Sequence, residues 1–407
     1  MMKIDIQSRR ILGLLIIASI AGPAIYIGIQ ELQLFRIALL ISTLFIIMIY
    51  SHKKLNVRDV NSIIVLAFFS FYFFWTISIS IFLSNLNIND LFNFFILYLL
   101  ILNIIFYINL NPKSFFDVLY KISILMFFIM FIIALWEIMT HNHLAVSTSN
   151  NVASYIEYMP TTFFTNPNDF AAILTMIILF SLYNNRIMQK NNVKLLLIMF
   201  IIAEFIAFIT NSRLNILVLS LTFILYFIKP KYFLHILIIT IIILGISIPI
   251  VDFIKTNDIF NIDYLIAGLG FGGDSTSVRS TLYLDAILSI EKNFGLGHGI
   301  NSSMLYFLNL NDPALHGAVN THNYVLELLI NSGVVVFFFF ILLNIFLTYR
   351  FIVKKMYFNI YLLFMYYIIL MSSSSSLFLW YHYIFFLGLI INSNNLLLNH
   401  KQIYNLK

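Results

Sequence analysis

The chain has 407 residues, of which 61% are hydrophobic and only 10% are charged, and its formal net charge is +6. A soluble domain is about half apolar and about a quarter charged, so this composition excludes a water-soluble globular protein. The absence of cysteine also excludes disulfides and thiolate-bound metals. We therefore predict an all-α polytopic membrane protein in which residues 1–407 form a single membrane domain.

Apolar stretches long enough to cross a bilayer occur along most of the chain. Since about twenty apolar residues span the hydrocarbon core, the sequence predicts about twelve transmembrane helices. They cover residues 11–29, 32–50, 60–83, 91–109, 115–139, 170–183, 195–210, 214–228, 233–250, 324–349, 357–371 and 377–391. The first stretch has no small-residue cleavage site, so we interpret it as a span and not as a signal peptide.

Two longer polar segments interrupt the spans, at residues 141–168 and 251–322, and the charges predict on which side they lie. With a cytoplasmic N-terminus, 18 of the 23 Lys and Arg residues fall in inside segments. Cytoplasmic loops carry this excess in membrane proteins, so we expect both termini inside and both polar segments outside. The basic charge is then explained by topology, and we expect the lipid bilayer and no nucleic acid as a partner.

The turn between the seventh and eighth spans carries Asn211, Ser212 and Arg213 at the external face. Arg213 is the one cation of this hairpin, and a guanidinium group offers a planar set of donors that suits phosphate oxygens. The alternative is an interfacial arginine whose side chain extends to lipid headgroups.

Arg279 lies in the large external segment, after four glycines in residues 268–273. Ser and Thr residues followed by apolar positions predict an amphipathic helix that ends near Lys292, with Arg279 in its first turn. A cation there opposes the helix dipole, and a bound anion would offset that conflict. A flexible glycine loop is the alternative.

Further along this segment, His298 lies in a tight turn at residues 294–299, and His316, His322 and Asn323 lead into the tenth span. An imidazole at the external face could act as a general base, which makes His322 the first candidate. Capping of the helix by His322 and Asn323 is the alternative. The spacing of the three histidines matches no usual metal site, so we expect no metal.

Two carboxylates complete the candidates. Glu204 lies inside the seventh span, where a carboxylate is costly and therefore a functional candidate. Glu327 lies one turn into the tenth span and could orient His322 or an acceptor.

Several short motifs in this order resemble the O-antigen ligase and Wzy-type polysaccharide polymerase superfamily, which includes the teichuronic acid polymerases. They are Asn166–Ala171, Asn211–Arg213, Arg279, Gly295–Gly299 and His322–Tyr324 with Gly333. The resemblance implies a glycosyltransferase-C-like membrane fold with one large external loop containing short helices. It also implies an inverting glycosyltransferase of the bacterial cytoplasmic membrane that acts on the external face without a cofactor or metal.

The donor implied by this resemblance is an oligosaccharide on undecaprenyl diphosphate. Arg213 and Arg279 would bind its diphosphate, and His322 would take the proton from the acceptor hydroxyl. A chain-length regulator protein is a further candidate partner. We expect the acceptor side to be formed by the external residues 141–159 and 302–315.

Three functions remain open at this point. A polymerase would extend another lipid-linked glycan, and a ligase would transfer the glycan to lipid A core or to a protein. A flippase or transporter should show charges through both leaflets and an internal repeat. Because the embedded charges lie mostly in the outer half and no repeat is visible, we expect the polymerase of surface polysaccharide (O-antigen or capsule) repeat units.

Overall fold

The described part of the computed structural model is helical and contains no extended strand, which confirms the predicted all-α class for these residues. It comprises residues 2–22, 33–52, 60–144, 159–164, 166–187, 192–226, 274–300, 306–307, 323–370 and 380–391. The helices are α1 (Met2–Ala21), α2 (Leu34–His52), α3 (Val60–Phe82), α4 (Ile88–Leu110), α5 (Pro112–Thr140), α6 (Pro167–Ile187), α7 (Val193–Ile209), α8 (Arg213–Tyr226), α11 (Asp274–Lys292), α13 (Tyr324–Val353), α14 (Tyr357–Leu370) and α15 (Trp380–Ile391).

Four of these helices are long and apolar enough to cross a membrane, namely α3, α4, α5 and α13. Shorter apolar helices occupy the positions of several other predicted spans, including those of α2, α8, α14 and α15. The predicted span at residues 233–250 lies outside the described residues. The total of about twelve crossings therefore stays a prediction.

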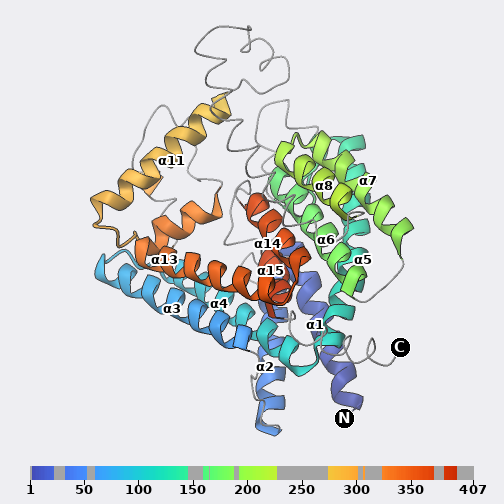
Figure 1. Cartoon of the computed structure of the whole chain (residues 1–407), viewed down its shortest axis with the longest axis horizontal. Helices are drawn as coiled ribbons and strands as arrows, with labels where there is room; N and C mark the ends of the chain where they lie inside the picture. The colour runs from blue at the N-terminus through green and yellow to red at the C-terminus, as the bar shows by residue number, and fades with distance from the viewer. Residues whose placement is uncertain are drawn as a thin grey trace.

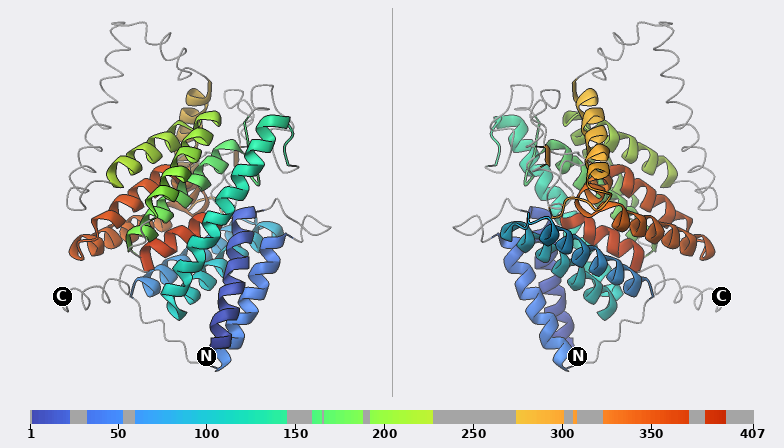
Figure 2. Two further views of the ribbon diagram at one scale, coloured as in Figure 1. Left: turned by 90° about the vertical axis from the view of Figure 1, so that its right-hand side faces the viewer. Right: turned by 90° about the vertical axis from the view of Figure 1, so that its left-hand side faces the viewer.

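The helices pack in three groups. α1 packs against α2 and α5, α3 packs against α4 and α13, and α6, α7 and α8 pack together (Figure 1). α14 and α15 lie between these groups, and the two side views show α1 and α2 running side by side toward the N-terminus (Figure 2). Every described side chain of α15 from Tyr381 to Ile391 is buried, so this helix lies in the core.

The outer helices carry large apolar side chains on their surface. Phe74 is 63% exposed, Ile132 is 65% exposed and Phe208 is 76% exposed. A soluble protein rarely exposes extensive apolar patches, whereas hydrocarbon is a favourable surrounding for them. This surface agrees with the membrane environment predicted from composition.

Asn111 shows how a single side chain ends one of these helices and begins the next. Its backbone N–H donates to the Tyr107 carbonyl at the end of α4 at 3.2 Å, and its side-chain oxygen accepts from Ser114 N–H at 3.1 Å. Pro112 follows as the first residue of α5, where its missing N–H costs nothing. The chain can therefore reverse between two apolar helices with few unsatisfied backbone groups.

The predicted amphipathic helix of the large external segment is confirmed as α11, and it ends at Lys292. Its 19 residues make it longer than the short helices expected for this segment. α11 packs against the first part of α13 and lies apart from α5 to α8 (Figure 1). The helix begins at Asp274, an acidic residue that favours a helix start. Arg279 consequently lies in the second turn, and its predicted place in the first turn is wrong.

The predicted orientation can be tested with single cysteines, because the natural sequence has none. Phe294 is 93% exposed in the turn after α11, and Lys355 is exposed in the turn between α13 and α14. We expect a membrane-impermeant maleimide to label Phe294→Cys in intact cells and Lys355→Cys only after permeabilisation. The opposite labelling pattern would reverse the predicted topology.

Candidate functional site

α13 is interrupted near its N-terminal end. Gly333 has φ 77° and ψ −178°, so the helix consists of a short segment at residues 324–332 and a longer one at residues 334–353. A break of this kind leaves backbone N–H and C=O groups without helical partners. Such groups are costly in a membrane protein and must be satisfied by other parts of the chain.

The predicted tight turn at residues 294–299 supplies those partners. His298 N–H donates to the Ile330 carbonyl at 2.8 Å, and Gly299 N–H donates to the Asn331 carbonyl at 2.9 Å. In the opposite direction, Val334 N–H donates to the Gly295 carbonyl at 2.8 Å. We call this pairing of residues 295–299 with residues 330–334 the glycine junction.

Glycine is required on both sides of the junction. A Cβ built on Gly297 would lie 2.5 Å from Gly333 N and 2.8 Å from the Ser332 carbonyl carbon. A Cβ on Gly333 would meet the backbone of Gly295 and Leu296. Both glycines also have positive φ, which other residues rarely adopt. The Gly295–Gly299 pattern therefore reflects close backbone packing.

α3 holds the junction from a third side. Trp75 Nε1 donates to the Ser332 carbonyl at 2.9 Å, and Ser80 Oγ accepts from Ile300 N–H at 2.8 Å. Asn85 Nδ2 donates to the His298 carbonyl at 2.5 Å. The junction thus joins the end of α11, the break in α13 and the C-terminal end of α3.

The side chain of His298 has a structural place in this junction. It is half-buried, its Nε2 lies 3.1 Å from the Ser289 carbonyl of α11, and its ring contacts Tyr306 with centroids 5.1 Å apart. Burial lowers the pKa of His298, although the hydrogen bond to Ser289 opposes this shift. A neutral ring that donates from Nε2 fits this geometry.

Asn323 caps α13, which is the alternative that the sequence offered to a direct role in the site. Its side-chain oxygen accepts from Val325 N–H at 3.0 Å and from Leu326 N–H at 3.3 Å. His316 and His322 lie outside the described residues. The role of His322 as a general base and the expected absence of a three-histidine metal site therefore stay predictions.

Glu327 lies one turn after Asn323 and is buried, with 6% exposure. It is close enough to Tyr72 and Tyr324 to act on both electrostatically. The Tyr324 ring in turn contacts His382 of α15, with centroids 5.5 Å apart. His382 Nδ1 lies 2.8 Å from the Tyr366 hydroxyl. A cluster of polar and aromatic side chains therefore packs against the N-terminal end of α13 from within the bundle.

Arg213 is the first residue of α8, and its side chain is partly exposed. The preceding turn depends on Asn211, which has φ 52°, and on Ser212, whose N–H donates to the Ala207 carbonyl at 2.9 Å. Ser212 also accepts a hydrogen bond from Asn215 at 2.8 Å. Asn211 and Ser212 thus shape the turn that presents Arg213.

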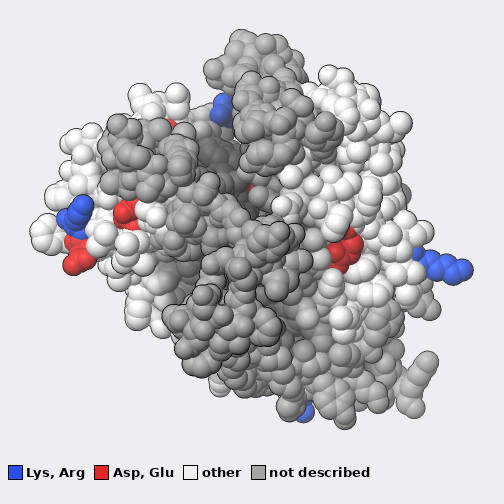
Figure 3. Space-filling model, turned by 90° about the horizontal axis from the view of Figure 1, so that it is seen from above, with Lys and Arg blue, Asp and Glu red and all other residues white. Residues whose placement is uncertain are grey.

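Arg279 lies on α11, but its side chain is outside the described part, so its joint action with Arg213 stays a prediction. Seen from above, the described charged side chains lie at separate places and form no single cluster (Figure 3).

Glu204 has a partner on the next helix. Its Oε1 accepts a hydrogen bond from Ser220 Oγ of α8 at 2.7 Å. This bond links α7 to α8, the two helices on either side of the turn that precedes Arg213. Glu204 therefore has a structural role in this hairpin.

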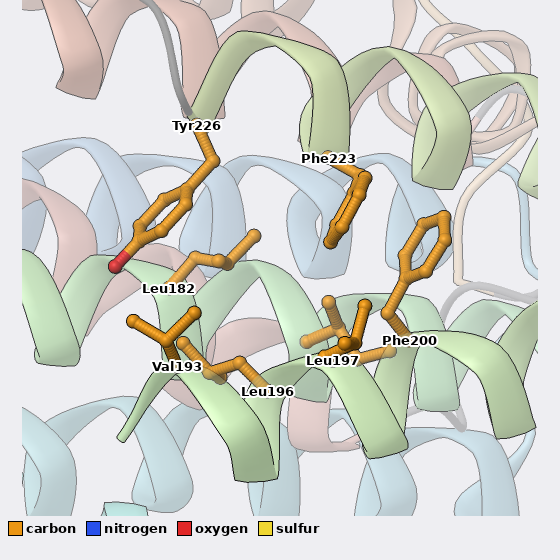
Figure 4. Close-up of a pocket in the computed structure, with 8 residues that line it drawn as sticks. Leu182, Val193, Leu196, Leu197, Phe200, Phe223 and Tyr226 are labelled. Atoms are coloured by element: carbon orange, nitrogen blue, oxygen red, sulfur yellow. The ribbon is translucent and has the colours of Figure 1, made fainter. Parts of the chain in front are cut away.

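A small pocket between α6, α7 and α8 lies beside this hairpin. Its lining is apolar apart from Tyr226, and Phe200 and Phe223 stack on each other in the lining with centroids 4.2 Å apart (Figure 4). Without an acid, base or cation in its lining, this pocket offers no group for glycosyl transfer.

Glu137 is a residue that the sequence reasoning missed. It is fully buried near the end of α5, and its Oε2 accepts from Thr161 N–H at 2.8 Å and from Thr162 N–H at 2.9 Å. Its Oε1 lies 3.7 Å from His143 Nδ1. The position of Glu137 inside the predicted span 115–139 was the available signal, because carboxylates at membrane depth are functional candidates.

Alanine at position 297 should destabilise the protein. A positive φ alone costs a residue with a side chain about 1–3 kcal/mol, and the contact with Gly333 adds to that. We expect Gly297→Ala to lower the unfolding temperature in detergent. Gly13→Ala is the matched control, because a Cβ at Gly13 would meet only ordinary contacts of 3.8 Å. Equal unfolding temperatures for the two variants would contradict the close packing.

Removal of the Glu137 carboxylate should loosen the backbone at Thr161 and Thr162, near the end of the polar segment 141–168. In Glu137→Ala, the Thr161 and Thr162 amides lose a buried acceptor, which costs about 1–3 kcal/mol. We expect faster hydrogen exchange at these two amides, while Glu137→Gln keeps an acceptor oxygen and most of the protection. Glu291→Ala, at an exposed position of α11, is the control. Unchanged exchange in Glu137→Ala would refute the role.

The predicted site residues fall largely within one region of similarity to known proteins. The model of the O-antigen ligase family matches residues 195–341, which include α7, α8, α11 and the break in α13. The teichuronic acid biosynthesis protein TuaE of Bacillus subtilis (strain 168) is 24% identical over 328 residues. This alignment covers 76% of the chain and 66% of TuaE, slightly less than two thirds of that protein. No solved structure matches the chain. These two similarities confirm the resemblance of the chain to the O-antigen ligase and Wzy-type polysaccharide polymerase superfamily.

Proposed function

We propose that this protein is a membrane-embedded polymerase of surface polysaccharide repeat units. It transfers a glycan from an undecaprenyl-diphosphate-linked donor to the non-reducing-end hydroxyl of a lipid-linked acceptor, on the external face of the cytoplasmic membrane. The glycine junction is the observation that carries this proposal. It fixes α11, which bears Arg279, against the short first segment of α13, which begins two residues after His322.

The reaction requires one base and a stabilised leaving group. His322 accepts the proton of the acceptor hydroxyl, and the oxygen attacks the anomeric carbon of the donor sugar. The bond between that carbon and the diphosphate oxygen breaks with inversion, and undecaprenyl diphosphate leaves as the anion. Arg213 and Arg279 balance the negative charge that develops on the diphosphate, which is where preorganised positive charge is most effective.

The supporting residues suit this division of roles. The base needs a fixed place relative to the diphosphate, and the Asn323 cap with the buried Glu327 gives the start of α13 a defined conformation. The hydrogen bond between Glu204 and Ser220 does the same for the hairpin that presents Arg213. Both carboxylates therefore act in this proposal as positioning residues.

A ligase that transfers the glycan to lipid A core or to a protein is the second candidate. The description of the matching family as O-antigen ligase favours it, while the name of the relative, a teichuronic acid biosynthesis protein, favours the polymerase. The two functions share the donor and the chemistry, so they differ only in the acceptor. A flippase would instead move the lipid-linked glycan without cleaving it.

The experiment supplies the purified protein in nanodiscs with an undecaprenyl-diphosphate-linked repeat unit in the presence of chelator. We expect chain elongation, and a loss of about 10²–10⁴-fold in His322→Ala because the general base is removed. Arg213→Lys and Arg279→Lys should also lose activity, since lysine keeps the charge but not the planar fork.

Lys121→Ala is the matched control for loss of a cation, because Lys121 is exposed and pairs with Asp117 at 3.0 Å on the predicted inner side. It should elongate chains like the wild type. Transfer only after addition of lipid A core would identify the ligase. Movement of the lipid-linked glycan across liposomes without any product would refute the enzyme.

A further inference from the structure

A lateral groove lies between α3 and the longer segment of α13. It has a volume of about 410 Å³ and is lined by eight apolar side chains. They include Ile64, Ala67, Phe68 and Phe71 of α3, with Phe339 and Leu343 of α13. This volume lies within the roughly 300–1,000 Å³ that is typical of ligand pockets. We call it the α3–α13 groove.

The groove is open toward the surroundings and closed toward the bundle. Phe68 and Leu343 form its floor and are buried, with 8% and 4% exposure, whereas Phe339 at its rim is 44% exposed. The lining offers no charged group or hydrogen-bonding side chain. Such a lining suits a hydrocarbon chain and offers nothing to a polar ligand.

The groove is aligned with the candidate site because both lie along the same two helices. Phe71 contacts Phe339 at the outer end of the groove, with ring centroids 5.0 Å apart. One turn further out, Trp75 contacts Phe71 at 5.7 Å and hydrogen-bonds to the Ser332 carbonyl of the glycine junction. Along α13, Phe339 lies six positions after Gly333, which is a rise of about 9 Å along the helix.

We propose that the α3–α13 groove binds the isoprenoid chain of the lipid-linked substrate. The assignment rests on the proposed function, because a substrate whose diphosphate lies at the external face must extend its chain into the hydrocarbon directly below. The groove begins about two turns below the junction and follows α13 inward. It thus holds the first isoprene units while the diphosphate stays near the start of α13.

Selectivity for this chain comes from packing and from the attached diphosphate. Lipid tails are as apolar as the groove, so association in a membrane depends on close contacts and not on a hydrophobic driving force. Four phenylalanine rings line the groove and give a rigid surface for a methyl-branched chain. An acyl chain of a phospholipid lacks the second attachment at the candidate site.

The test uses an undecaprenyl diphosphate that carries a photoreactive group in its isoprenoid chain, with the full chain in nanodiscs. We expect crosslinks to peptides that contain residues 64–71 and 339–346. Unlabelled undecaprenyl diphosphate should compete with them, and phosphatidylglycerol should not. Ala67→Trp fills the groove and should reduce the crosslinks about tenfold. Ile63→Trp is the matched control, because Ile63 is also exposed on α3 and does not line the groove.

A kinetic measurement adds an independent readout. Ala67→Trp should raise KM about tenfold for the undecaprenyl donor and leave kcat unchanged. A donor with only two isoprene units is too short to follow the groove, so its KM should be equal in the wild type and in the variant.

Three results would overturn the groove assignment: equal competition by phosphatidylglycerol, crosslinks to other helices, or Ala67→Trp that crosslinks like the wild type. A protein that crosslinks as expected but transfers no glycan would instead refute the proposed function and retain the groove. The two failures are therefore distinguishable.

Discussion

The backbone pairing between the turn at residues 295–299 and the break in α13 is the constraint on which the position of α11 depends. Three hydrogen bonds of 2.8–2.9 Å cross it. They satisfy backbone groups that the break at Gly333 would otherwise leave without partners. Because Gly297 and Gly333 allow backbone to meet backbone, α11 is held at a fixed place on α13 although more than thirty residues of sequence separate their ends.

Buried polar groups elsewhere in the bundle follow the same rule. Glu137 receives two backbone N–H groups, Glu204 receives the Ser220 hydroxyl, and His382 lies against the Tyr366 hydroxyl. In each pair the partners come from different helices or from a helix and an external segment. Since an unsatisfied polar group in hydrocarbon costs several kcal/mol, these pairs fix which elements can be neighbours. Apolar packing in lipid is much less selective.

The sequence predicted the features that depend on local composition. Runs of apolar residues placed the described helices, capping by Asn323 was one of two interpretations that the sequence left open, and the amphipathic pattern placed the end of α11 near Lys292. The start of α11 was less well predicted, because polar residues such as Asp274 are compatible with either a loop or a first helical turn. Arg279 was therefore placed one turn too early.

The long-range contacts could not be predicted from one sequence. The motif Gly295–Gly299 indicated a tight turn, but nothing local shows that its carbonyl and N–H groups pair with residues 330–334. The partner of Glu204 is likewise on another helix, and Glu137 differs from its neighbours only in charge. The rule that treats embedded carboxylates as candidates applies equally to Glu137 and Glu204, so consistent use of it would have found both.

The division of α13 into two segments gives this one helix two kinds of surface, which suits the amphiphilic substrate that we propose. Its short first segment is capped by Asn323, contains the buried Glu327 and is joined to α11, so it belongs to the polar end of the two helices. Its longer segment carries Phe339 and Leu343 into the apolar groove with α3. An unbroken helix would present no turn to which residues 295–299 could bind. The break at Gly333 is therefore what allows a polar site and an apolar groove to share the same two helices.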